Sequence, residues 1–169
     1  MTARPLIWYP EIQQIEGIDL RMAGATIAVA SDHAGFDLKE LLKRDLQDAG
    51  HDVLDLGTHS TQSVDYPDFG RAMGEVIASG KAGRGVIVCG SGIGISIAAN
   101  RNPKVRAVLA HDTTSARLAR EHNDANVVAF GQRLIGIEVA REALKVFLAT
   151  PFEGGRHAGR VAKLSKEIA

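Results

Sequence analysis

The chain has 169 residues, of which 45% are hydrophobic and 24% are charged, as expected for one globular domain. Twenty Lys and Arg balance twenty Asp and Glu, which excludes the broad basic field that holds a nucleic acid or an anionic membrane. A single cysteine excludes an internal disulfide and favours a cytoplasmic protein. No apolar run approaches the roughly 18 residues of a membrane span.

Short apolar strands alternate with amphipathic helices in the first half of the chain. We expect a strand at 26–30 and a helix from 36 to about 50, where a glycine ends it. A second strand at 53–56 precedes a helix whose apolar positions recur over 69–79. The next strand, 85–89, is apolar throughout, which is typical of a parallel strand buried on both faces.

The alternation continues to the end of the chain, with helices near 96–100, 115–121 and 135–148 and strands at 107–110 and 127–130. Five strands separated by helices predict an α/β fold, a doubly wound five-stranded parallel sheet in the flavodoxin-like order 2-1-3-4-5. Residues 1–24 lie outside this pattern. We therefore expect them to be an appendage to a single domain formed by residues 25–169.

The turn after the third strand has the strongest chemical signal. The strand ends at Cys89, and Gly90, Ser91, Gly92, Ile93 and Gly94 follow where a helix is expected to begin. Ligands of open parallel sheets bind beyond the carboxyl ends of the strands. Exposed backbone N–H groups at a helix start bind a phosphate or an oxyanion and favour a thiolate. The competing interpretation is that Cys89 is a small buried hydrophobe beside a tight turn.

Three other classes of site fail on particular residues. A dinucleotide-binding turn needs a third glycine at position 95, and a cysteine phosphatase needs an arginine there, but Ile95 occupies it. A phospho-accepting regulator would have an aspartate where Cys89 stands.

Other polar residues are expected at both edges of the sheet. Asp32 and His33 follow the first strand, at the same edge as Cys89, although Asp32 is also placed to cap the next helix. His122 and Asn123 precede the last strand and so belong to the amino edge. The basic residues near position 156 follow a helix that returns to that same edge. A strand of about five residues spans roughly 17 Å, so the two groups cooperate only if an antiparallel two-fold dimer shares its sites.

The chain resembles the type-B ribose-5-phosphate isomerases and related aldose-ketose isomerases from Thr26 onward. The likeness rests on five stretches: Ser31-Asp32-His33-Ala34-Gly35, Asp65-Tyr66-Pro67, residues 89–100 (CGSGIGISIAAN), Glu121-His122-Asn123-Asp124 and Gly155-Arg156-His157.

This resemblance implies interconversion of ribose 5-phosphate and ribulose 5-phosphate through a cis-enediolate, with no metal or cofactor. It implies that Cys89 is the base, that Ser91 and the amides of residues 90–94 stabilise the enediolate, and that His122 opens the sugar ring. The remaining contacts it implies are Asp32 and Tyr66 on the hydroxyls, Asn123 at the reacting end, and His33, Arg133, Arg156 and Arg160 around the phosphate. It also implies a homodimer with shared sites, with a tetramer as an open alternative.

Two departures from the family pattern bear on these roles. Some relatives use a glutamate at the position of Ile95 in place of the cysteine, so this chain resembles the cysteine branch. Ser91 stands where many relatives have threonine, and the hydroxyl is kept. Two alternatives stay open: the same chemistry on a four- or six-carbon sugar phosphate, and a non-catalytic sugar-phosphate-binding subunit.

Overall fold

The structure is a computed structural model that describes residues 26–165. The expected appendage, residues 1–24, lies outside the described residues. Within them, no helix combines the length and the apolar character needed to cross a lipid bilayer.

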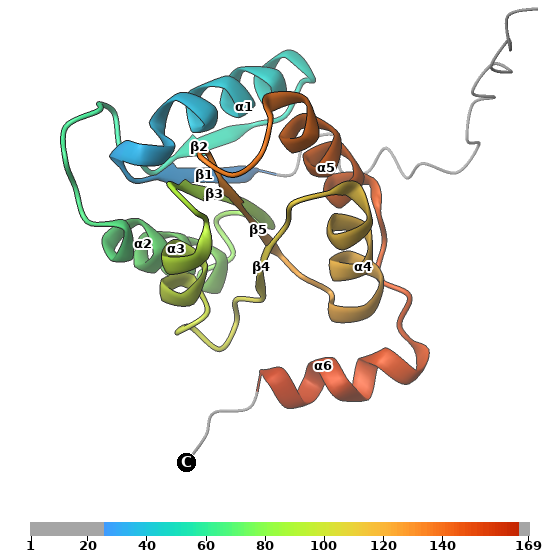
Figure 1. The fold of residues 1–169 in the computed structure, drawn as a ribbon. Helices are drawn as coiled ribbons and strands as arrows, with labels where there is room; N and C mark the ends of the chain where they lie inside the picture. The colour runs from blue at the N-terminus through green and yellow to red at the C-terminus, as the bar shows by residue number, and fades with distance from the viewer. Residues whose placement is uncertain (1–25, 166–169) are drawn as a thin grey trace, which may run out of the picture.

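A five-stranded parallel sheet forms the centre of the domain (Figure 1). Its strands are β1 (Ile27–Ser31), β2 (Val53–Asp55), β3 (Arg84–Cys89), β4 (Ala107–Leu109) and β5 (Val127–Gly131), and all their pairings are parallel. The expected α/β fold is confirmed.

The strand order is β2-β1-β3-β5-β4, so the expected order was wrong for its last two strands. The physical reason is burial. All five residues of β5 are buried, whereas the three residues of β4 are only half-buried. A strand that is apolar on both faces lowers the free energy most in the middle of a sheet, and a short half-exposed strand suits an edge.

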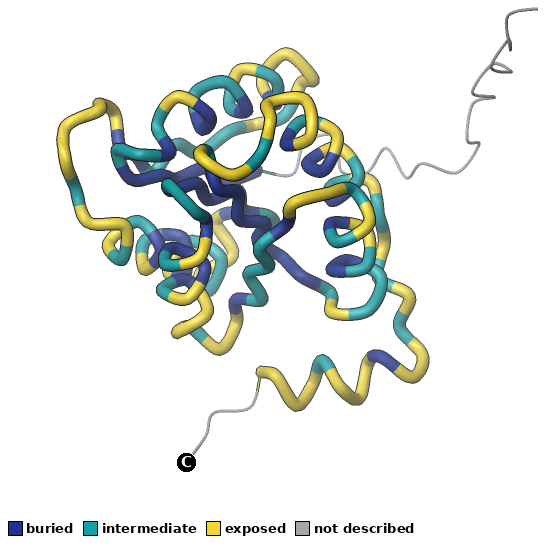
Figure 2. The backbone as a smooth tube through the Cα atoms, in the orientation of Figure 1, coloured by how far each residue is buried: buried dark blue, intermediate teal, exposed yellow. Residues whose placement is uncertain are grey.

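Helices cover both faces of the sheet. One apolar layer packs α1 (Phe36–Asp48), α4 (Thr113–Asn123) and α5 (Ile137–Ala149) against it, and the other packs α2 (Tyr66–Ala78) and α3 (Ile93–Ala99). Successive strand residues serve opposite layers: Ile27 and Val29 face the first, Ala28 and Ala30 the second. Figure 2 shows β1, β3 and β5 buried along nearly their whole length, whereas β2 and β4 are intermediate in burial.

Two helix boundaries and one additional helix differ from expectation in ways that bear on the site. The helix α3 begins at Ile93, directly after the loop that follows Cys89. The helix α4 runs to Asn123, so that His122 and Asn123 lie in its last turn. The C-terminal segment, expected only to be basic, contains the 3-10 turn η3 (Gly155–His157) and the helix α6 (Ala158–Leu164). The helix α6 has no buried residue and projects from the body of the domain (Figures 1 and 2).

Candidate active site

Cys89 ends β3 at the carboxyl edge of the sheet. Its side chain is buried, with 5% exposed, and its Sγ accepts a hydrogen bond from the backbone N–H of Gly92 at 3.0 Å. Ser91, in the same loop, accepts at its Oγ from the N–H of Ile93 at 3.3 Å. Backbone N–H groups directed at a sulfur favour negative charge on it. Cys89 also packs in the apolar layer under α2 and α3, so it is both a core residue and a candidate base.

The loop after Cys89 admits no side chain at Gly92. This residue is the N-cap of α3 and has φ 76°, ψ −15°, the left-handed conformation. A Cβ atom there would lie 2.4 Å from the side chain of Leu109 and 2.9 Å from the carbonyl carbon of Phe130. Both φ and the available space therefore require glycine, and the N–H that meets Cys89 is held in place by the surrounding strands.

Asp32 and His33 flank Cys89 from β1, because Ser31 pairs with Val88 in the sheet. Oδ1 of Asp32 accepts hydrogen bonds from the N–H groups of Ala34 at 2.9 Å and Gly35 at 3.0 Å. The helix-capping interpretation of Asp32 is thus correct for this oxygen. Nδ1 of His33 lies 3.2 Å from the backbone of Val64, which ties the β1 turn to the loop before α2.

Tyr66 and Arg133 border the same loop from two further elements. The Tyr66 ring packs against the first turn of α3, where a Cβ on Gly94 would lie 2.6 Å from it. The backbone N–H of Arg133 donates to the carbonyl of Gly90 at 3.0 Å, and its guanidinium lies over that glycine, 3.3 Å from where a Cβ would be. The carboxyl edge therefore brings together six functional groups. They belong to Cys89, Ser91, Asp32, His33, Tyr66 and Arg133.

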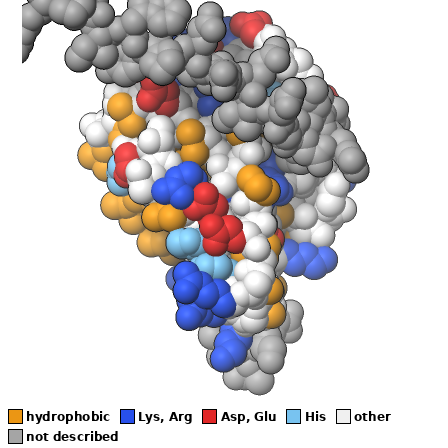
Figure 3. All heavy atoms as spheres, turned by 90° about the vertical axis from the view of Figure 1, so that its right-hand side faces the viewer, with side chains coloured by type: hydrophobic (Ala, Val, Ile, Leu, Met, Phe, Trp, Pro, Cys, Tyr) orange, Lys and Arg blue, Asp and Glu red, His pale blue; other side chains and the backbone are white. Residues whose placement is uncertain are grey.

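A second polar group lies at the opposite edge, at the end of α4. The rings of His122 and His157 stack with their centroids 4.4 Å apart and an interplanar angle of 6°. The Glu153 carboxylate lies 4.0 Å from Nε2 of His122 and 3.6 Å from Nε2 of His157. Asn123, Arg156 and Arg160 are exposed nearby in the chain. Figure 3 shows histidine side chains on this face between acidic and basic ones.

The pKa of His157 is lowered from its ordinary value. Removal from solvent is the largest cause, followed by the neighbouring positive charge on His122 and on Arg156, while Glu153 acts in the other direction. Nε of Arg156 also lies 3.3 Å from Nε2 of His157 and donates to it. The lowered pKa favours the neutral imidazole of His157.

The structure does not bring the two groups together within one chain. Cys89 stands where β3 ends, whereas His122 precedes the loop that leads into the start of β5. The five residues of β5 separate the two edges by roughly 17 Å.

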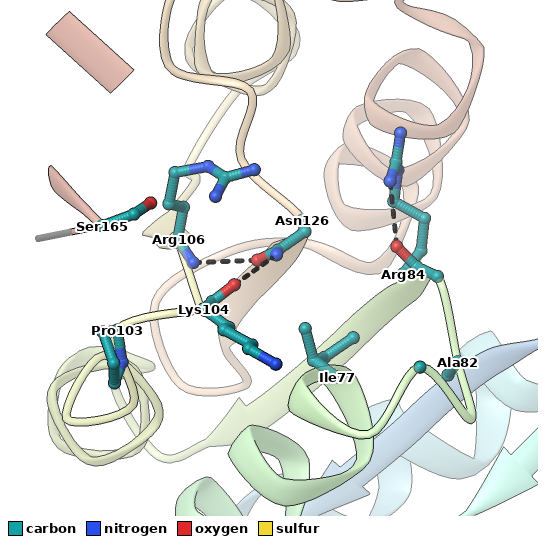
Figure 4. A pocket seen from close by; sticks show the side chains of 10 residues that line it. Ile77, Ala82, Arg84, Pro103, Lys104, Arg106, Asn126 and Ser165 are labelled. Carbon is teal, nitrogen blue, oxygen red and sulfur yellow. Dashed lines mark hydrogen bonds between the residues drawn. The ribbon is translucent and has the colours of Figure 1, made fainter. Parts of the chain in front are cut away.

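The amino edge also holds a cavity of about 640 Å³ beside Arg84, Lys104, Arg106 and Asn126 (Figure 4). Several of its polar groups are engaged in structure: Asn126 accepts from the Arg106 N–H at 2.8 Å and donates to the Lys104 carbonyl at 2.8 Å. Nε of Arg84, by contrast, is buried with no hydrogen-bond partner among the described residues. Arg106 pairs with Asp124 at 2.7 Å. These contacts join the starts of β4 and β5, and none of them involves a nucleophile.

Glu153 is the polar residue that the sequence analysis missed. Its spacing of four residues from His157 is a weak signal, and its partner His122 is 31 residues away. Only the fold shows the group, because the N–H of Glu153 donates to the carbonyl of Glu121 at 3.1 Å and so fixes the C-terminal segment to α4.

Comparison with known proteins identifies the family of the chain. The family profile described as Ribose/Galactose Isomerase matches residues 27–164. Ribose-5-phosphate isomerase B of Escherichia coli is 42% identical over 82% of this chain and 93% of its own length. D-erythrulose-4-phosphate isomerase of Pectobacterium atrosepticum is 41% identical over 82% of this chain and 92% of its own.

Among solved structures, a ribose 5-phosphate isomerase of Thermotoga maritima superposes with a TM-score of 0.82 at 48% identity, covering 83% of this chain and 97% of that one. With the family profile spanning nearly all the described residues and relatives above 40% identity, the chain belongs to the ribose/galactose isomerase family and is a sugar-phosphate isomerase.

Proposed function

We propose that the protein interconverts ribose 5-phosphate and ribulose 5-phosphate with Cys89 as the base. The observation that carries the proposal is the contact of Cys89 Sγ with the Gly92 N–H at 3.0 Å, which places the thiol beside a backbone donor at the carboxyl edge of the sheet, where ligands of such sheets bind. Relatives that act on ribose 5-phosphate support the five-carbon substrate. The relative named D-erythrulose-4-phosphate isomerase leaves a four-carbon sugar phosphate as the alternative substrate.

The chemistry needs one proton to cross between two carbons. The Cys89 thiolate takes the proton from C2 of the open-chain aldose, and the electron pair of that C–H bond forms the C1–C2 double bond of a cis-enediolate. The thiol then returns the proton to C1, while the hydroxyl proton moves from O2 to O1. Ser91 and the backbone amides of residues 90–94 stabilise the charged oxygen, an effect on the order of 10² to 10³ in rate for one donor.

The remaining groups hold the sugar on both sides of the reacting carbons. In this proposal one oxygen of Asp32 caps the turn after β1 and the other meets a sugar hydroxyl, as does Tyr66. A phosphate anchored far from the reacting bond positions that bond over the sulfur. The residues assigned to binding are His33, Tyr66, Gly90, Gly92, Ile93, Gly94, Asn123, Arg133, Arg156 and Arg160.

The site is shared between two chains in a homodimer. His122, Asn123, Arg156 and Arg160 belong to the amino edge, and an antiparallel two-fold axis places one chain's amino edge against its partner's carboxyl edge. An exposed apolar surface beside the Cys89 loop supports this arrangement. Tyr66, Ile93 and Ile97 are 43%, 50% and 51% exposed there, and a second copy would cover them.

His122 has a separable task in this proposal, since it opens the ring of the aldose. Ribulose 5-phosphate cannot close a five-membered ring, because its O5 carries the phosphate. A His122→Ala variant should therefore lose aldose conversion yet keep solvent exchange of the C1 proton of the ketose. Equal loss of both activities would contradict the assigned role.

The substrate itself is tested with a panel of four-, five- and six-carbon aldose phosphates, assayed for ketose formation with and without EDTA. We expect the highest kcat/KM for ribose 5-phosphate. A higher value for a four- or six-carbon substrate would reassign the sugar. Absence of turnover on the whole panel by a folded dimer would favour the binding-subunit alternative. Cys89→Ala serves as the background control.

A further inference from the structure

The group formed by His122, Glu153 and His157 has the composition of a metal site. One ligand atom from each side chain lies within 4.8 Å of the other two, and the two pairs that involve Glu153 measure 4.0 and 3.6 Å. Four ligands at about 2.1 Å around a tetrahedral zinc ion lie about 3.4 Å apart. The group is therefore slightly wider than an occupied site.

The side chains that must move are free to do so. His122 and Glu153 are 36% and 52% exposed, so small rotations about their side-chain bonds bring their ligand atoms toward His157. The stacked rings have to turn toward each other, and the guanidinium of Arg156 has to release Nε2 of His157. Because these rearrangements cost free energy, we expect an ion to bind here more weakly than at a structural zinc site.

The backbone beneath the group is already fixed. The N–H of Glu153 donates to Glu121 in α4, and the N–H of His157 donates to Gly154 at 3.0 Å. His157 is itself buried, with 6% exposed. The three ligands thus come from two segments that hydrogen bonds hold together, and an ion would have to reorganise side chains only.

The donor atoms select the class of ion. Two imidazoles and one carboxylate suit Zn²⁺, Co²⁺ or Ni²⁺, whereas Mg²⁺ and Ca²⁺ require sets made of oxygen ligands. Three protein ligands leave one position open to water, as in exposed three-ligand zinc sites.

We propose that His122, Glu153 and His157 bind one divalent ion of the zinc class, and that the bound ion inhibits the isomerase by occupying Nε2 of His122. The inhibitory half rests on the proposed function, in which that imidazole opens the sugar ring. The binding half does not depend on it.

Binding is tested with Co²⁺ as the probe, in the Cys89→Ala background so that no thiol contributes to the spectrum. We expect one ion per chain, with the intense visible absorption of a four-coordinate cobalt centre. Adding Glu153→Gln should weaken binding at least about tenfold. The matched control is Glu138→Gln, which alters an exposed glutamate on α5 paired with Arg141 and should leave binding unchanged. Equal binding by the Glu153 and Glu138 variants would overturn the site.

Inhibition is tested with Zn²⁺ on chains that retain Cys89. Aldose conversion by the wild type and by Glu138→Gln should fall with added Zn²⁺ and return with EDTA, while Glu153→Gln should need at least about tenfold more zinc. Because every chain in this comparison has the same thiol, the difference isolates the histidine site. Cobalt binding without this difference in zinc sensitivity would overturn the inhibitory role. Cobalt binding by a chain that isomerises nothing would instead contradict the proposed function.

Discussion

The two edges of the sheet differ in how their polar groups are supported. At the carboxyl edge, Cys89 and the loop after it lie among β1, β3 and β5, and Gly92 has no room for a side chain. At the amino edge, the group around His122 rests on one helix end and on a segment whose last helix, α6, buries nothing. The loop at the carboxyl edge is fixed within its own chain, whereas the group at the amino edge rests on a more exposed support.

This difference indicates a division of work between the two edges. Groups that stabilise charge on reacting atoms need fixed positions, because a catalytic field works through preorganisation. Groups that open a sugar ring or bind a phosphate can lie on a more exposed segment, because a partner subunit can bury them when the dimer forms.

The largest expected effect follows from removing the proposed base, Cys89, at the carboxyl edge. Cys89→Ala should lower kcat by on the order of 10³ or more, because proton transfer by a positioned group contributes about 10² to 10⁴ and Ile95 offers no carboxylate in its place. Exchange of the substrate C2 proton with solvent measures this directly. Near wild-type exchange in a folded variant would make Cys89 purely structural.

Mixing two inactive variants tests whether the edges of different chains cooperate. Cys89→Ala and His122→Ala homodimers should each lack aldose conversion, whereas a heterodimer has one site with both residues intact. Random exchange makes half the dimers hetero, so activity should recover to about a quarter of wild type by the two-fold symmetry count. No recovery after exchange verified by mass spectrometry would place both residues in one chain's site.

Gly92→Ala tests the rigidity of the carboxyl edge. The added methyl meets Leu109 and the Phe130 backbone at a residue with positive φ. We expect a loss of roughly 2–4 kcal/mol in the free energy of unfolding, together with lower kcat. Gly80→Ala is the matched control, because Gly80 also has positive φ but nothing lies within 4 Å of its Cβ position. Equal losses in urea unfolding would show that backbone strain alone accounts for the effect.

Asp55 ends β2 at the carboxyl edge of the sheet, and we expect acid to weaken its ion pairs with two lysines. This carboxylate accepts from Lys39, which is completely buried, and from Lys43. Burial alone would raise the pKa of Asp55, but the hydrogen bonds from Lys43, the Gly57 N–H and Lys39 outweigh it and lower the pKa.

A lowered pKa in the folded state means that the contribution of Asp55 to stability is complete above the unfolded value of about 3.9 and is lost as pH falls through the folded value. Asp55→Asn should therefore cost about 1–3 kcal/mol at pH 7, and the difference from wild type should shrink below pH 4. Urea unfolding across this range measures it. A constant difference would show that the charge of Asp55 is irrelevant.

The sequence was sufficient to predict the alternation of strands and helices and the polar loop at the end of β3. It was insufficient for the strand order, since alternation does not say which strands are neighbours. The apolar runs at 107–110 and 127–130 have the same length, so the deeper burial of β5 compared with β4 is seen only in the structure. Glu153 and His122 form a group only through the tertiary fold, and the start of α3 depends on the left-handed conformation of Gly92, which requires its neighbours in space.

The position of β5 between β3 and β4 also determines which loop lies beside Cys89. Because β5 adjoins β3, Cys89 pairs with Gly131 and the loop that begins at Gln132 borders the thiol. The loop after β4, with His111 and Asp112, lies one strand further out. We therefore expect insertions in that loop to alter the rim of the proposed site while leaving the turn after β3 in place.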